Sequence, residues 1–117
     1  MTLQEHCDLS DFCYELSGGH DTEYRRTYPD GPRSRFLLEN SVMVAMADMS
    51  PIVRGHCLVA PRSHELSMAA IAKKDPWGLE DFVSQFLSGY MSVYGTAAVF
   101  EHGSGTSLNP SACVVHA

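Results

Sequence analysis

The sequence predicts an α+β domain with an antiparallel sheet of about five strands, one long helix and one short helix. Two observations support this class. Short aliphatic segments separated by tight turns stand in the first half of the chain and again near its end, whereas an apolar pattern of helical period stands between them. The order strands, helices, strands therefore predicts an α+β domain with an antiparallel sheet.

Three short aliphatic segments in the first half of the chain predict strands at 35–40, 42–47 and 56–60. The polar residues Glu39-Asn40-Ser41 separate the first two segments and predict a turn between them. Pro61 follows the third segment and predicts its end, since proline donates no backbone hydrogen bond. These residues therefore predict consecutive antiparallel strands.

Two helices are expected after these strands, a short one at 67–73 and a long one that ends near Tyr94. Asp75 followed by Pro76 predicts the start of the long helix, because aspartate caps helices and proline favours the first helical position. Gly95 predicts its end. Apolar residues recur within it at intervals of three and four and predict a core-facing stripe: Leu79, Phe82, Val83, Phe86, Leu87, Tyr90, Met91 and Tyr94.

The remaining segments complete a single domain over residues 1–117. Residues 97–100 and 113–116 predict the last two strands, with a loop rich in glycine and serine between them. Residues 1–33 are expected to be irregular, because glycine pairs, prolines and charges interrupt any regular period there.

Charge and composition exclude several classes of protein. The chain has 14 acidic and 8 basic residues and a net charge of −6, which disfavours binding along an extended nucleic acid. No apolar run approaches the roughly 20 residues of a membrane helix, and the first residues do not resemble a secretory signal. We therefore expect a cytoplasmic protein with no membrane partner, in which the four cysteines remain thiols.

The most informative stretch of the sequence is residues 47–64. A predicted strand ends in Asp48, Gly55-His56 opens a short apolar strand, and a Pro-x-x-His sequence ends at His64. This pattern resembles the histidine triad (HIT) superfamily, which includes dinucleoside polyphosphate hydrolases and is related to galactose-1-phosphate uridylyltransferase.

Three further segments extend the resemblance over most of the chain. Phe100-Glu101-His102-Gly103 and residues 111–116 look like the approach to the family signature, and Cys13-Tyr14-Glu15-Leu16 is similar to the N-terminal segment of many bacterial members. The resemblance implies a HIT-like fold that binds a nucleoside phosphate derivative. It also implies nucleotidyl hydrolysis or transfer, and a two-fold homodimer.

The signature of this family is three histidines that alternate along a strand, so that they face the same side. The middle histidine attacks the α-phosphorus of a nucleotide and forms a covalent intermediate. Here His116 matches the first, catalytic-site histidine, and the middle position falls beyond Ala117. Two interpretations stay open: the natural protein is longer, or the chain is a non-catalytic nucleotide- or partner-binding module. We expect negligible turnover by the covalent route from these 117 residues.

The resemblance assigns substrate contacts to three residues. Asp48 matches the acidic residue that accepts hydrogen bonds from the ribose hydroxyls, and the alternative is an aspartate that caps a turn. His56 is expected to support the phosphate site, or simply to be hydrogen-bonded at a strand end. His102 lies in the loop before the signature, near the expected pocket. Arg54 and Arg62 are expected to be solvated surface residues.

The resemblance also implies a zinc site, because related proteins bind zinc through a Cys-x-x-Cys pair, the Pro-x-x-His histidine and the first triad histidine. The matching positions are Ser10, Cys13, His64 and His116. Serine is a poor zinc ligand, so Cys7 is the candidate for the fourth position. The alternative is a half-lost site of ordinary thiols and histidines.

Overall fold

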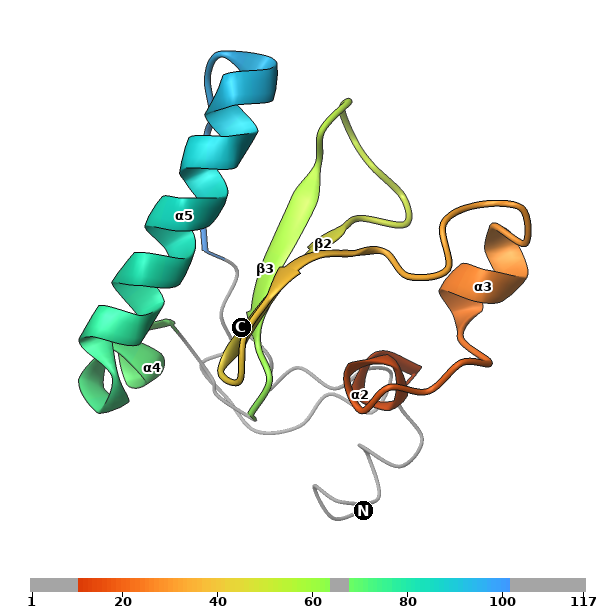
Figure 1. Ribbon diagram of the computed structural model, residues 1–117, viewed down its shortest axis with the longest axis horizontal. Helices are drawn as coiled ribbons and strands as arrows, with labels where there is room; N and C mark the ends of the chain where they lie inside the picture. The colour runs from red at the N-terminus through yellow and green to blue at the C-terminus, as the bar shows by residue number, and fades with distance from the viewer. Residues whose placement is uncertain (1–10, 64–67, 102–117) are drawn as a thin grey trace.

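The computed structural model of the chain describes residues 11–63 and 68–101 (Figure 1). In this part of the chain the elements are, in order, α2 (Asp11–Leu16), α3 (Glu23–Thr27), β1 (Phe36–Glu39), β2 (Met43–Ala47), β3 (Cys57–Pro61), α4 (Met68–Lys74) and α5 (Pro76–Tyr94). The class is α+β, as predicted. No helix in these ranges is both long enough and apolar enough to cross a membrane.

The three strands form an antiparallel sheet in the order β1-β2-β3. The helices α4 and α5 lie on one side of this sheet, and α2 lies on the other (Figure 1). The turn between β1 and β2 is closed by Asn40, whose side-chain oxygen accepts hydrogen bonds from the backbone N–H groups of Val42 and Met43 at 2.8 and 2.7 Å. The turn predicted at Glu39-Asn40-Ser41 is thus confirmed.

The central strand β2 is buried on both faces. Met43, Val44, Ala45 and Met46 have no exposed surface. Because successive side chains of a strand point to opposite faces, Met43 and Ala45 pack in the cluster with α4 and α5, whereas Val44 and Met46 pack in the cluster with α2. The sheet therefore has a hydrophobic layer on each side.

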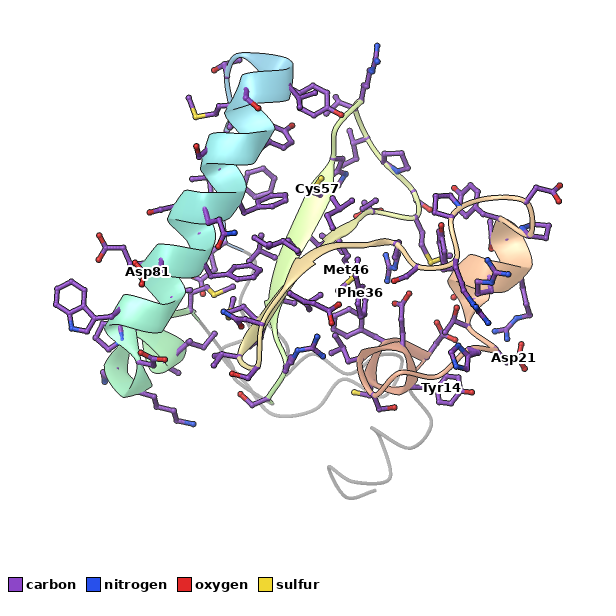
Figure 2. All side chains as sticks on the ribbon, viewed as in Figure 1. Tyr14, Asp21, Phe36, Met46, Cys57 and Asp81 are labelled. Carbon is purple, nitrogen blue, oxygen red and sulfur yellow. The ribbon has the colours of Figure 1, made fainter. Side chains whose placement is uncertain are left out.

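The two clusters differ in the residues that cover the sheet. Buried residues of the first cluster are Met43, Ala45, Ile71 and Phe82, and its partly buried neighbours include Leu79 and Phe86. Buried residues of the second cluster are Val44, Met46 and Ala60, and its partly buried neighbours are Phe12, Leu16, Phe36 and Leu58. Figure 2 shows Phe36 and Met46 on the α2 side of the sheet.

A β-bulge lets the short strand β1 contribute to both clusters. The pairing register shifts between Phe36, which lies opposite Met46, and Leu38, which lies opposite Ala45. In a regular strand these two side chains would share one face. The extra residue places Phe36 in the α2 cluster and Leu38 in the α4–α5 cluster, and it leaves Leu37 exposed.

The long helix α5 begins and ends where the sequence predicts. The Asp75 side chain accepts a hydrogen bond from the backbone N–H of Gly78, and Pro76 is the first helical residue. Gly95 ends the helix in the left-handed conformation with φ 80°. Only the first part of the predicted stripe meets the core: Phe82 is 3% exposed, whereas Tyr94 is 43% exposed.

A buried ion pair attaches α2 to the sheet. Arg35 donates from Nε to Glu15 Oε2 at 2.9 Å and from Nη2 to Glu15 Oε1 at 2.7 Å, and both side chains are 8% exposed. Arg35 also donates from Nη1 to the backbone carbonyl of Ala47 at 3.0 Å. One guanidinium therefore joins α2, the start of β1 and the end of β2.

Two predictions about secondary structure are corrected. The described residues contain three strands rather than five, because 97–100 forms no ladder and Val99 and Phe100 are 69% and 84% exposed. Aliphatic composition alone does not supply a strand with a partner. The predicted strand at 113–116 lies outside the described residues.

The second correction concerns residues 1–33, which were expected to be irregular. The short helices α2 and α3 lie in this segment. Thr22 caps α3 by accepting a hydrogen bond from the backbone N–H of Arg25, and α2 buries Glu15 against Arg35. A five-residue or six-residue helix has too few turns to create the long apolar period that predicts helices from sequence.

We predict that Glu15→Gln lowers the free energy of unfolding by about 3–5 kcal/mol, because it leaves the Arg35 guanidinium buried without a counter-charge. Urea denaturation measures the change. The exposed pair of Arg26 and Asp21 is the control, and Arg26→Ala should cost less than about 1 kcal/mol. The double variant Glu15→Leu/Arg35→Met should be more stable than Glu15→Gln, and equal losses in both would contradict this account.

Candidate functional site

Asp48 and His56 lie side by side at one end of the β2–β3 hairpin. The last ladder pair is Ala47 with Cys57, and the backbone N–H of Asp48 then donates to the carbonyl of His56 at 3.1 Å. The antiparallel register therefore places the residue after β2 opposite the residue before β3. Of the three predicted substrate residues, Asp48 and His56 belong to the described residues, and this register brings them together.

The carboxylate of Asp48 is held by two neighbours. Its Oδ1 accepts a hydrogen bond from the backbone N–H of Ser50 at 2.7 Å, which is an Asx turn. Its Oδ2 lies 3.6 Å from Nε2 of His56. The side chain is 21% exposed, so the carboxylate is oriented from within the protein and still reached by solvent.

The imidazole of His56 has a hydrogen-bond partner at Nδ1 and the Asp48 carboxylate facing Nε2. Its Nδ1 accepts a hydrogen bond from the backbone N–H of Ile52 at 3.2 Å. An accepting Nδ1 carries no proton, so a neutral ring carries its proton on Nε2, which faces Asp48. His56 therefore orients the Asp48 carboxylate and closes the loop between the strands.

Three tyrosines position this loop, and none of them was singled out in the sequence as a site residue. Tyr28 donates from its hydroxyl to the backbone carbonyl of Met49 at 2.7 Å. Gly55 has φ 85°, and a Cβ built on it would lie 2.9 Å from Tyr90 Oη and from Tyr94 Cζ. In the sequence, Tyr90 and Tyr94 are spaced like core-facing residues of a helix, so they predict packing rather than a site. Only their contact with Gly55 in the structure relates them to the site.

The Cys57 thiol lies directly beside this pair in the chain, at the start of β3 (Figure 2). Burial raises the pKa of Cys57, and the negative charge of Asp48 raises it further. Both effects disfavour the thiolate, which is the reactive form of cysteine. The half-buried Cys57 side chain is therefore a protonated thiol at neutral pH and a poor nucleophile.

Of the four predicted zinc ligands, only Cys13 belongs to the described residues, where it lies half-buried on α2. Cys7, His64 and His116 lie outside them, so the zinc site stays a prediction. Within residues 11–63 and 68–101, no three His, Cys, Asp or Glu side chains are close enough together to hold a metal ion.

The two other predicted site residues, the catalytic-site His116 and the substrate residue His102, also lie outside the described residues.

Arg62 is not the solvated surface residue that the sequence predicts. Arg62 donates from Nε to the carbonyl of Asn40 at 2.7 Å and from Nη1 to the carbonyl of Leu16 at 3.2 Å. It joins the β1–β2 turn to α2, whereas Arg54 is exposed as expected.

In comparisons with known proteins, no family model, no curated protein and no solved structure matches this chain.

We predict that the Cys57 thiol reacts slowly with iodoacetamide at pH 7.5 and that its rate rises steeply as the pH increases above 9. Asp48→Asn removes the neighbouring negative charge and should accelerate alkylation, although burial, the larger cause of the raised pKa of Cys57, still slows it. Mass spectrometry of the Cys57 peptide measures the rate. Asp81→Asn, on the exposed face of α5, should leave it unchanged.

We further predict that Gly55→Ala destabilises the protein by at least about 1–2 kcal/mol, because alanine is strained at this φ and its Cβ would press on two tyrosine rings. Gly89→Ala in α5 is the matched control. No described atom lies within 4 Å of a Cβ at that position, and alanine should stabilise the helix by about 0.5–1 kcal/mol. In thermal denaturation, Gly55→Ala should lower the melting temperature and Gly89→Ala should raise it.

Proposed function

We propose that this chain binds a nucleoside phosphate derivative, with the ribose diol on the carboxylate of Asp48. The observation that carries this proposal is the pairing of Asp48 with His56 at the end of the β2–β3 hairpin, with 3.6 Å between Oδ2 and Nε2. These two residues are part of the segment in which the chain resembles the HIT superfamily. That resemblance supports an activity of nucleotidyl hydrolysis or transfer.

The geometry of Asp48 suits a vicinal diol. A carboxylate oxygen accepts about two hydrogen bonds, and each oxygen of Asp48 has one protein neighbour. One acceptor position on each oxygen is therefore left for a ribose hydroxyl. Because Ser50 and His56 fix the orientation of the carboxylate, little side-chain entropy is lost when the sugar binds.

In this proposal His56 is a positioning residue. In the neutral ring the Nδ1 lone pair accepts from the N–H of Ile52 and Nε2 carries the proton that faces Asp48, so no free lone pair is left to attack phosphorus. The resemblance assigns the phosphate contact to His116. The second candidate is a module that binds nucleotides without chemistry, because the roles argued for Asp48 and His56 are binding and positioning.

The test is isothermal titration calorimetry with AMP, GMP, CMP and UMP, and with the 2′,3′-dideoxy form of the nucleotide that binds best. The wild type should bind the ribonucleotide about 10- to 100-fold more tightly than the dideoxy form, since hydrogen bonds to a charged group contribute about 1.5–3 kcal/mol. Asp48→Asn should remove most of this difference. Asp81→Asn is the matched control and should preserve it.

Equal affinity for the ribose and dideoxy forms, or no nucleotide binding, would refute the ribose assignment. Hydrolysis of a diadenosine polyphosphate and a nucleotide phosphoramidate, measured in the same samples, separates the two candidates. Hydrolysis lost on replacing His116 would support the enzyme. Binding without hydrolysis would support the module, and hydrolysis that survives replacement of both His102 and His116 would contradict the histidine mechanism.

A further inference from the structure

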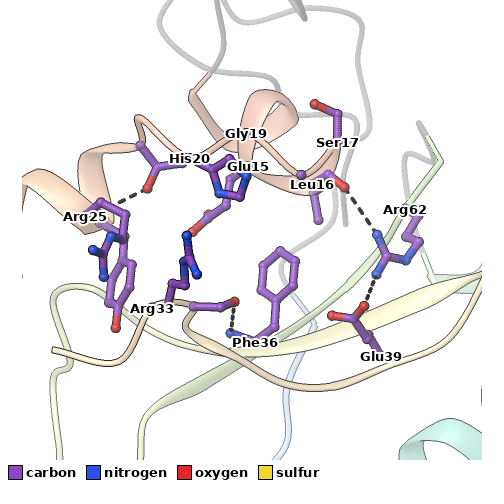
Figure 3. A pocket seen from close by; sticks show the side chains of 14 residues that line it. Glu15, Leu16, Ser17, Gly19, His20, Arg25, Arg33, Phe36, Glu39 and Arg62 are labelled. Atoms are coloured by element: carbon purple, nitrogen blue, oxygen red, sulfur yellow. Dashed lines mark hydrogen bonds and ion pairs between the residues drawn. The ribbon is translucent and has the colours of Figure 1, made fainter.

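A concave site lies on the α2 side of the sheet and shares no residue with the Asp48–His56 pair. This pocket has a volume of about 570 Å³ and is formed by the end of α2, the glycine turn that follows it, α3 and the start and end of β1 (Figure 3). Pockets that bind small organic ligands in proteins are commonly about 300–1,000 Å³. The size therefore suits a small organic molecule.

One end of the pocket carries positive groups with little local neutralisation. Figure 3 shows Arg25 and Arg33 gathered there, with the imidazole of His20 beside them. Arg33 has no hydrogen-bond or ion-pair partner among the described residues. Within the same residues, the guanidinium of Arg25 makes a single long hydrogen bond, from Nη1 to the carbonyl of Pro32 at 3.4 Å. Most of the guanidinium N–H groups at this end are therefore available to a ligand.

The nearby carboxylate of Glu15 does not cancel this charge. Glu15 lines the pocket, but Arg35 binds it from behind through two nitrogens at 2.9 and 2.7 Å. The second carboxylate of the pocket, Glu39, lies at the opposite end, 3.3 Å from Arg62. The end with Arg25 and Arg33 therefore stays positive in a chain whose net charge is −6.

The middle of the pocket is apolar. The Phe36 ring stands between the Arg33 end and the Arg62 end in Figure 3, and Leu16 lines the pocket beside it. Phe36 is held there by the bulge in β1, which turns it toward α2. A flat ring can contact the Phe36 ring while an anionic group attached to it reaches the guanidinium groups.

We propose that this pocket binds a small organic anion, an aromatic ring bearing one carboxylate or phosphate group. The ring packs against Phe36, and the anion is bound by Arg33 and Arg25. Arginine is suited to both anions, because its planar guanidinium donates two parallel hydrogen bonds to paired oxygens. The proposal does not depend on nucleotide binding at Asp48.

The test is a ¹⁵N NMR titration of the full chain at low salt with phenyl phosphate, benzoate, inorganic phosphate and benzyl alcohol. Shifts of the Gly18, Gly19 and Phe36 amides are expected with phenyl phosphate or benzoate, at least fivefold tighter than with inorganic phosphate or the neutral alcohol. The tighter of the two aromatic anions identifies phosphate or carboxylate as the preferred group.

Variants of the arginines test which side chains bind the anion. Arg33→Gln and Arg25→Gln should each weaken binding of the tighter probe at least fivefold, whereas Arg54→Gln, an exposed arginine outside the pocket, should leave it unchanged. Because Arg33 is exposed, its variant should keep the wild-type spectrum elsewhere. No shift at the pocket amides, equal weakening by Arg54→Gln, or equal affinity for inorganic phosphate would overturn the proposal.

Discussion

The two-sided burial of β2 is the constraint on which the rest of this structure depends. Four consecutive residues, Met43 to Met46, are fully buried, so each face of a three-stranded sheet must be covered. The helices α4 and α5 cover one face. On the other face the cover is α2, a helix of six residues that is too short to be stable by itself. The buried pair of Glu15 and Arg35 therefore fixes α2 where the second hydrophobic layer requires it.

The same sheet explains how the candidate nucleotide site is assembled. Pairing of β2 with β3 places Asp48 opposite His56, and the backbone hydrogen bond between them continues the ladder. The loop that joins the strands is then held at four points. Ser50 donates to Asp48 and Ile52 donates to His56. Tyr28 donates to the carbonyl of Met49, and Gly55 lies against the tyrosines of α5. The Asp48 carboxylate is thus oriented by hydrogen bonds that begin in the hydrophobic sheet.

The bulge in β1 relates the core to the second pocket. Because the register shifts between Phe36 and Leu38, one short strand supplies an aromatic ring to the α2 layer and a leucine to the α5 layer. The Phe36 ring then forms the apolar middle of a pocket whose ends carry arginines. A packing requirement of the core and the shape of a surface site are therefore met by the same side chain.

Much of the fold could be predicted from the sequence, as could the closeness of Asp48 to His56, whereas other contacts could not, for a physical reason. The caps of α5 and the Asn40 turn depend on hydrogen bonds within about four residues, so the local sequence determines them. The strands beside Asp48 and His56 were predicted from their short aliphatic segments, although their partners lie 10 to 18 residues away. The bulge, the missing strand at 97–100, the Glu15–Arg35 pair and the anchored Arg62 depend on partners from distant parts of the chain, as far as 46 residues apart for Arg62 and Leu16. Only tertiary structure decides such contacts, because which distant group comes within reach depends on how the layers pack.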